Sequence, residues 1–183
     1  MIEITQDLLK EFLDYNKDSG NFTWKIRDRK WFDYDSIFKS WNSRYANKEA
    51  GSIQTAKSGT KYLIIVIFGK SRKAHRLAWI YENGNTPFKH LDHINGEGTD
   101  NRIINLREVT KGQNSRNMKM DKRNTSGCTG VYWNSHRGKW ISRITVNGKH
   151  KSLGYFDILD EAIKTRKSAE KTHGYHENHG RKR

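Results

Sequence analysis

Four polar side chains lie at spacings that would let them act together on a phosphodiester bond. Asp92 and His93 stand side by side at the end of an expected strand, before a turn marked by Gly96. Asn105 begins an expected returning strand, and Asn114 lies in an expected following helix. A neutral imidazole can take a proton from water, while carboxylate and amide oxygens can hold a hard divalent ion. A second amide oxygen can hold the imidazole in one tautomer, so the group suits phosphodiester hydrolysis.

Composition indicates the kind of protein that carries this group. The chain has 183 residues and a net charge of +15, and its six Trp, eight Tyr and seven Phe supply core material. No apolar run reaches the roughly 20 residues of a membrane span, and the N-terminus lacks the layout of a signal peptide. The single cysteine, Cys128, excludes an internal disulfide and a multi-cysteine zinc site. We therefore expect a soluble cytoplasmic protein, not secreted, whose partner is a polyanion, with no membrane and no obligatory protein partner.

The first half of the chain predicts a mixture of helices and strands around the four polar residues. The strand expected at 62–68 is nearly all apolar, which predicts burial on both of its faces. Residues 27–47 show no clean periodicity and support no prediction. The expected elements are a helix capped by Thr5, strands at 22–26, 51–53 and 62–68, and a helix at 75–81 ended by Gly84.

The second half is more basic and predicts a small unit after a linker. Residues 111–151 hold ten Lys or Arg against one Asp. Within them, 117–127 has almost no apolar anchor and predicts a basic linker, either merely solvated or in contact with a DNA backbone through Lys122 and Arg123. The expected elements beyond it are strands at 131–133, 139–146 and 149–155, an Asn147-Gly148 turn, and a helix from Asp157 to about His173.

The hairpin at 139–155 has one face whose chemistry suits a DNA groove. A two-residue turn pairs Thr145 with His150 and Arg143 with Ser152, so these four side chains share a face. Arg143 can donate two hydrogen bonds to guanine. The opposite face, toward the helix, is expected to carry Trp140, Ile144 and Leu153. Cations suited to phosphates stand at the margins of the sheet, namely Arg137, Lys149 and Lys151.

Several matched segments resemble one known family. Asp92-His93, Asn105-Leu106-Arg107 and Asn114, with flanks at 74–79 and 100–103, resemble the HNH nucleases of the ββα-metal fold, specifically the phage and intron-borne homing endonucleases. The resemblance covers roughly 60–118. It implies that His93 is the general base and that Asn105 polarises it. It also implies that Asp92 and Asn114 bind one Mg²⁺ or Mn²⁺. The cysteine-ligated structural zinc of other HNH proteins is not expected, because the chain has a single cysteine.

A second resemblance covers residues 128–176. The segments that carry it are Gly130-Val131-Tyr132-Trp133, Lys139-Trp140, Leu153-Gly154-Tyr155-Phe156 and Asp160-Glu161-Ala162. They resemble the DNA-binding domain of plant ethylene-response factors. In that family a three-stranded antiparallel sheet, backed by one helix, lies in the major groove. Double-stranded DNA is therefore the expected partner.

These observations lead to a site-specific, metal-dependent DNA endonuclease of the homing type that nicks as a monomer. The alternative is a non-cleaving DNA-binding regulator that keeps a relic HNH fold, and an RNA-binding protein fits the charge but not a major-groove sheet. His75, beside Leu77 and Ala78, is interpreted as a buried structural histidine rather than a functional one. The predicted class is α+β. Its parts are an N-terminal supporting segment 1–59, an HNH unit 60–118, a basic linker 119–127, an ethylene-response-factor-like domain 128–176 and a basic tail 177–183.

Overall fold

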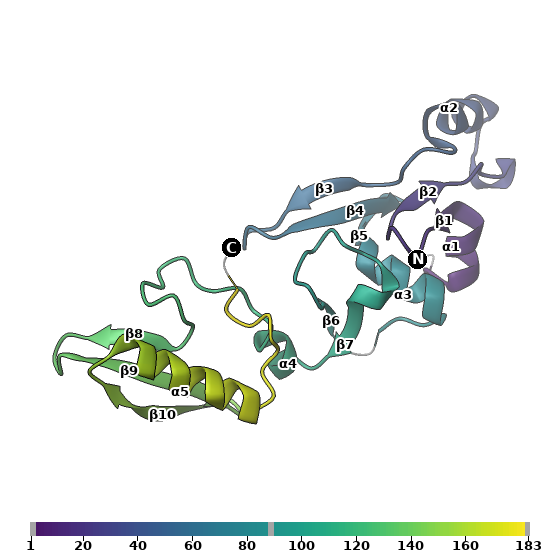
Figure 1. Ribbon diagram of the computed structural model, residues 1–183. Coiled ribbons are helices and arrows are strands. Elements are labelled where there is room, and N and C mark those ends of the chain that lie inside the picture. Colours follow the sequence, from purple (N-terminus) through teal and green to yellow (C-terminus); the bar gives the residue numbers. More distant parts are fainter. Residues whose placement is uncertain (1–2, 88–89, 182–183) are drawn as a thin grey trace. The chain divides into compact units, whose positions relative to one another are not determined.

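A computed structural model describes residues 3–87 and 90–181, and it divides into two compact units (Figure 1). Unit 1 comprises residues 1–108 and unit 2 comprises residues 109–183. Both mix helices with small antiparallel sheets, as the α+β prediction required. Residues 1–2, 88–89 and 182–183, which belong to the predicted N-terminal segment, HNH unit and basic tail, lie outside the described residues. None of the helices in the described part is long and apolar enough to cross a membrane.

Unit 1 begins with a helix that packs its apolar face into the core. The Thr5 hydroxyl accepts a hydrogen bond from the Leu8 amide and caps α1, as predicted. Leu9 and Phe12 are fully buried beneath it. The elements of unit 1 are α1 (Gln6–Phe12), β1 (Leu13–Tyr15), β2 (Phe22–Trp24), η1 (Arg29–Trp31), α2 (Asp35–Tyr45), β3 (Ser52–Thr55), β4 (Lys61–Ile67), β5 (Lys70–Lys73), α3 (Ala74–Asn83), β6 (His90–His93), η2 (Ile103–Asn105) and β7 (Leu106–Val109). The last strand of unit 1, β7, runs one residue past the boundary between the units.

The central sheet of unit 1 has the order β3-β4-β5 and packs against the core through β4. Ile65 and Ile67 are buried there, while Val66, on the opposite face, is 52 % exposed. The prediction that this strand is buried on both faces is therefore wrong at its end, because no element among the described residues covers the Val66 side chain. The α3 helix follows directly and ends at Gly84, whose φ of 75° is the left-handed conformation that glycine adopts most easily.

Residues 27–47, for which the sequence supports no prediction, are held to unit 1 by one arginine among aromatic rings. The Arg27 guanidinium lies 4.5, 4.8 and 3.9 Å from the ring centroids of Phe12, Trp24 and Trp41. Trp41 comes from α2, so this cation–π cluster ties that helix to α1 and β2. Burial lowers the pKa of Arg27 to about 10, which still leaves it charged near neutral pH.

Unit 2 contains a three-stranded antiparallel sheet in the order β10-β9-β8, with one long helix against it. Its elements are α4 (Lys111–Ser115), β8 (Val131–Asn134), β9 (Lys139–Val146), β10 (Lys149–Phe156) and α5 (Leu159–Thr172). The predicted strands and turn are confirmed. The predicted cap is wrong: α5 begins at Leu159 after Ile158, and the Asp157 carboxylate instead pairs with Lys139 Nζ at 3.0 Å.

Residues 119–127 are not a free linker, because this part of the chain is tied into unit 2. The Gly180 amide donates to the Met118 carbonyl at 2.9 Å, and the Met120 amide donates to the Arg181 carbonyl at 3.0 Å. Arg181 Nη1 also donates to the Asn117 carbonyl at 2.7 Å, and Asn117 is only 3 % exposed. These partners come from the predicted basic tail, so that tail closes unit 2 instead of standing free. The sequence could not predict this attachment, because the segment has few apolar residues and is held by backbone hydrogen bonds.

Candidate active site

Asp92 and His93 lie at the end of β6, where the chain turns toward β7. Both residues are buried, and His93 is 6 % exposed. The Ile94 amide donates to the Asn105 carbonyl at 2.9 Å, and the Gly96 amide donates to the His93 carbonyl at 2.8 Å. The turn needs Gly96, whose φ of 72° favours glycine. The strand–turn–strand unit that the spacing predicted therefore holds Asp92, His93 and Asn105 together within unit 1.

The Asn105 side chain fixes the loop that follows His93. Its Oδ1 accepts from the Asn95 amide at 3.0 Å, and its Nδ2 donates to Asn95 Oδ1 at 3.1 Å and to the Asp100 carbonyl at 2.9 Å. The family resemblance implied that Asn105 polarises the imidazole. In the structure the side-chain amide that interacts with His93 is that of Asn101, and Asn105 acts on the loop. The role of Asn105 in polarising His93 therefore stays a prediction from the family resemblance.

The same loop is braced by three further contacts within unit 1. Tyr15 Oη donates to the Asn101 carbonyl at 2.7 Å. A Cβ on Gly20 would come within 2.5 Å of the Arg102 amide nitrogen, and one on Gly98 within 2.3 Å of the Lys61 carbonyl oxygen. Such approaches leave space only for glycine, so the loop lies directly against the β1–β2 turn and β4. The backbone around His93 is therefore held from several sides before any substrate binds.

The electrostatics of His93 favour a neutral imidazole that can accept a proton. Burial lowers the pKa of His93, while a hydrogen bond with Asn101 and the nearby carboxylates of Asp92 and Asp100 oppose that change. The positive charge of Lys73 adds to the lowering. A neutral imidazole beside carboxylates that would stabilise its protonated form has the properties of a general base.

A second histidine, which the sequence analysis interpreted as structural, lies against His93. His75 is buried near the start of α3, and its ring centroid is 4.8 Å from that of His93, with the ring planes at 90°. Tyr62 of β4 lies 5.8 Å from His75 and 6.2 Å from His93, and Lys73 Nζ lies 4.1 Å above the Tyr62 ring. The predicted burial of His75 is confirmed. Its contact with His93 was missed, because a spacing of 18 residues carries no periodic signal.

The predicted metal ligands are distributed over the two units. Asp92 Oδ2 accepts from Arg107 Nη2 at 3.0 Å and from Arg107 Nε at 3.2 Å, which links β6 to β7. Asn114 lies on α4 in unit 2 and is exposed. No cluster of three or more His, Cys, Asp or Glu suited to a metal occurs among the described residues. One carboxylate does fit Mg²⁺, which usually takes one or two carboxylates and completes its shell with water and substrate phosphates.

The open face of the unit 2 sheet has the predicted register. Thr145 pairs with His150 and Arg143 with Ser152, and the Thr145 hydroxyl lies 3.0 Å from His150 Nδ1. The same face holds two arginines on aromatic rings, Arg143 5.4 Å from Tyr132 and Arg137 4.8 Å from Tyr155. Trp140 packs toward α5, while Ile144 is buried and Leu153 lies in a bulge between Ser152 and Gly154. The side chains predicted to contact DNA are exposed at Arg137, Arg143, Lys149, His150, Lys151, Lys122 and Arg123.

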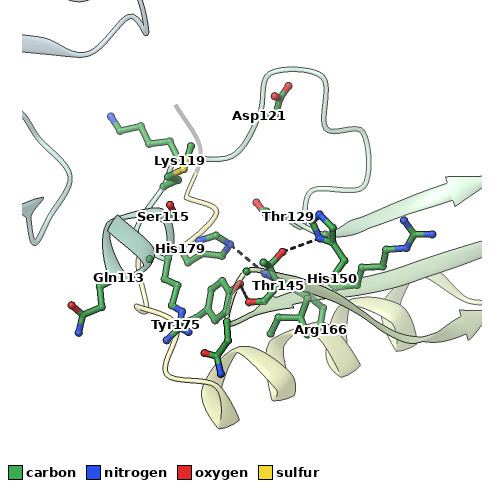
Figure 2. Close-up of a pocket in the computed structure, with 18 of the residues that line it drawn as sticks. Gln113, Ser115, Lys119, Asp121, Thr129, Thr145, His150, Arg166, Tyr175 and His179 are labelled. Carbon is green, nitrogen blue, oxygen red and sulfur yellow. Dashed lines mark hydrogen bonds between the residues drawn. The ribbon is translucent and has the colours of Figure 1, made fainter. Parts of the chain in front are cut away.

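One end of this face is enclosed instead of open. A pocket of about 930 Å³ lies between the sheet and the arm segment, which we define as residues 110–121 (Figure 2). Thr145 and His150 line it from the sheet, and Ser115, Lys119 and Asp121 line it from the arm segment. A DNA base or phosphate that meets Thr145 and His150 would therefore also meet the arm segment, which the prediction of an open sheet face did not include.

The floor of the pocket is a buried network around Arg166, which the sequence analysis did not identify. Arg166 donates through Nε to Glu170 at 3.0 Å, through Nη1 to the Arg143 carbonyl at 2.6 Å, and through Nη2 to His179 Nε2 at 3.3 Å. Tyr175 Oη donates to the Thr145 carbonyl at 2.7 Å. This network joins α5 and residues 175–179 to β9, so it fixes the backbone of the strand that carries Arg143 and Thr145.

Comparisons with known proteins found a family, a solved structure and a phage protein that are similar to this chain. A model of the HNH endonuclease family matches residues 72–116, which contain His75, Asp92, His93, Asn105 and Asn114. A solved structure of the HNH homing endonuclease I-HmuI, described for its DNA binding and cleavage, is 19 % identical and covers 92 % of this chain and 90 % of its own, with a TM-score of 0.35. Protein 3.8 of Escherichia phage T7 is 32 % identical over 108 residues, which are 58 % of this chain and 89 % of Protein 3.8. The chain therefore contains an HNH endonuclease domain and belongs to the same family as Protein 3.8 of phage T7.

Proposed function

We propose that this protein is a divalent-metal-dependent DNA endonuclease whose general base is His93. The observation that carries the proposal is the pair Asp92-His93, buried at the end of β6 and backed by a loop that Asn105 fixes, inside a segment matched by the HNH endonuclease model. An imidazole and a carboxylate held side by side supply the proton acceptor and the oxygen ligand that phosphodiester hydrolysis requires.

In this mechanism a water molecule attacks the phosphorus atom and passes its proton to the His93 imidazole. The P–O bond to the 3′ oxygen breaks, and that oxygen leaves with the electron pair of the bond. Asp92 and Asn114 would hold one Mg²⁺ or Mn²⁺, which when bound supplies positive charge opposite the phosphate and the leaving oxygen. Asn105 and Asn101 keep the loop and the ring in place while the proton moves.

The finer features of the proposal concern how DNA is selected. Unit 2, with the sheet face around Arg143 and Thr145, would act as the ethylene-response-factor-like reader, and its exposed cations would bind phosphates. The flanking segments at 74–79 and 100–103 favour the homing type of phage nuclease, which acts in the cytoplasm of a bacterial host. One general base in each chain favours a nick in one strand unless two chains act together.

A second candidate function follows from the contact between Asp92 and Arg107. A guanidinium already neutralises this carboxylate, which is the state expected in a DNA-binding regulator that has lost its metal. Such a protein would use unit 2 to bind DNA and would not cut it.

One experiment separates the two functions. A supercoiled plasmid library is incubated with the full-length protein in Mg²⁺, in Mn²⁺ and in EDTA, and nicked products are sequenced. The endonuclease proposal expects nicks at a recurrent sequence that require the metal and disappear in EDTA. Binding in a gel-shift assay without any nick would support the regulator, and full cleavage in EDTA would exclude the metal-dependent mechanism.

A further inference from the structure

The ring of His93 interacts with the Asn101 side chain through a hydrogen bond and also packs against neighbouring rings. Asn105 uses its side-chain oxygen and nitrogen on Asn95 and on the Asp100 carbonyl. The rings that lie within contact range of His93 are those of His75, at 4.8 Å and 90°, and Tyr62, at 6.2 Å and 44°. The His75 contact is close and perpendicular, the geometry that aromatic rings prefer, whereas that of Tyr62 is longer and tilted.

The element that carries His75 is rigid. His75 is the second residue of α3, and its neighbours Ala74, Leu77 and Ala78 are fully buried in the core of unit 1. Only 6 % of His75 is exposed, so its ring has no room to turn aside. A ring fixed on the core of α3 can therefore restrict the rotation of a ring on β6.

The nitrogen atoms of His75 contribute less to the positioning of His93 than the packing of its ring does. Within the described part of the chain, the buried His75 Nδ1 atom has no hydrogen-bond partner. Burial, together with the charges of His93, Lys73 and Arg76, lowers the pKa of His75 to about 3. His75 is therefore neutral when His93 takes up a proton, and it adds no full positive charge beside the imidazolium.

We propose that His75 is a positioning residue, which holds the His93 imidazole in the orientation that accepts a proton by packing edge-to-face against it. The proposal rests on the function proposed above and assigns His75 a role beyond its burial. Its ring would act through its shape. Another planar ring at position 75 should therefore keep His93 in place, whereas an aliphatic side chain should not. A misplacement of about 1 Å at a reacting group can cost on the order of a hundredfold in rate, which sets the scale of the effect.

The test compares His75→Phe, which keeps a ring, with His75→Leu and His75→Met, which do not. We expect the single-turnover cleavage rate of His75→Phe to stay within about threefold of wild type, and the rates of His75→Leu and His75→Met to fall about tenfold or more. DNA affinity should be unchanged in all three. His90→Phe, at an exposed position on the same strand, is the control for an added phenyl ring near the site.

A nuclear magnetic resonance measurement reads the ring of His93 without any cleavage. The side-chain ¹⁵N–¹H correlations of His93 should keep nearly their wild-type shifts in His75→Phe and move in the two aliphatic variants, in full-length protein without DNA. Equal rates in all variants, or unchanged His93 resonances, would overturn the positioning role, as would a Phe variant as slow as the Leu variant. A wild-type protein that cuts no DNA would instead contradict the proposed function, and the resonances would still report on His75.

Discussion

At the scale of single residues, Asp92 and His93 differ in their electrostatic environments. His93 is buried with its pKa lowered, so it is neutral near neutral pH and would gain a charge in the proposed reaction. The Asp92 carboxylate is already paired with Arg107 across the two strands. A cation that binds Asp92 must therefore share or displace the guanidinium, whereas a proton that reaches His93 meets carboxylates that stabilise it. The two residues are adjacent in sequence, yet they can be tested separately.

Replacement of His93 by alanine should remove the proton acceptor and leave the DNA-binding surfaces intact. We expect the cleavage rate of His93→Ala to fall by about 10²–10⁴-fold with nearly unchanged DNA affinity. Single-turnover cleavage and fluorescence anisotropy on the same duplex measure the two quantities. His90→Ala, exposed on the same strand, serves as the control. Loss of binding in parallel with cleavage would show that His93 is structural.

Replacement of Arg107 by alanine should increase the affinity of the site for a divalent ion. The guanidinium makes two hydrogen bonds to Asp92, and bonds of this charged type contribute about 1.5–3 kcal/mol. Without that competition, Mn²⁺ should bind about tenfold more tightly or better, as measured by electron paramagnetic resonance on free protein. Arg102→Ala removes a comparable pair with Asp100 away from Asp92 and is the matched control. Weaker Mn²⁺ binding in Arg107→Ala would mean that Arg107 organises the site instead of competing for it.

At the scale of elements, the sequence predicted those features of the fold that short-range interactions determine. The β9–β10 hairpin follows from alternation and Asn147-Gly148, and the Thr145–His150 pair follows from that turn. The bulge at Leu153 and the pairing of Asp157 with Lys139 could not be predicted, because each depends on the neighbouring strand. Long-range contacts were also hidden: nothing in the sequence indicates that α3 brings His75 to His93, or that residues 178–181 bind the arm segment.

The hairpin should read DNA through Arg143 on its open face and bind the DNA backbone through Lys151 at its margin. We expect Arg143→Ala to cost about 1–3 kcal/mol and to relax one position of the target. Lys151→Ala should weaken binding to all sequences alike and reduce the salt slope by about one. Selection of binding sites from a random library, repeated at several salt concentrations, distinguishes the two effects. A uniform loss across all sequences for Arg143→Ala would place it with the phosphate contacts.

The network beneath this hairpin should make unit 2 sensitive to acid. Burial lowers the pKa of His179 to about 4, from about 6.5 in the unfolded chain. Between about pH 6.5 and 4, His179 is therefore protonated in the unfolded state but not in the folded state. The free energy of unfolding falls as the pH drops through this range. His179→Gln removes this titration and should give a shallower fall of Tm over that range. His136→Gln, at an exposed position, is the control, and parallel curves for His179→Gln and wild type would exclude the effect.

At the scale of the whole molecule, the boundary between the units falls after Glu108 and not after the expected linker. Unit 1 keeps Asp92, His93 and Asn105, and it carries positive charge of its own: residues 50–81 hold six Lys or Arg and no Asp or Glu. Unit 2 keeps Asn114, the arm segment and the sheet face. The residues proposed for chemistry and those proposed for DNA reading thus lie largely in different units, except for the metal ligand proposed at Asn114.

Truncation at this boundary should separate folding from activity. Fragments 1–108 and 1–125 should unfold at the same Tm, because residues 117–120, which only the longer fragment contains, lack their partners at 178–181 there and add no packed structure to unit 1. Only 1–125 should nick DNA slowly, because it retains Asn114, while both should bind DNA weakly through unit 1. Calorimetry and plasmid nicking measure these outcomes, with full-length Asn114→Ala as the matched control. Slow nicking by 1–108 would show that Asn114 is not a metal ligand.

The bond between Arg181 and Asn117 joins positions 64 residues apart, and this distance has a consequence for the order of synthesis. Domains generally fold as units, the N-terminal one first, while the chain is still being made. All of unit 1 leaves the ribosome before residues 178–181 exist, so the buried His93 site can form while the arm segment still lacks its partner. Under the proposed function, the site around His93 would therefore form before the surface that selects DNA, for as long as it takes to translate the second unit.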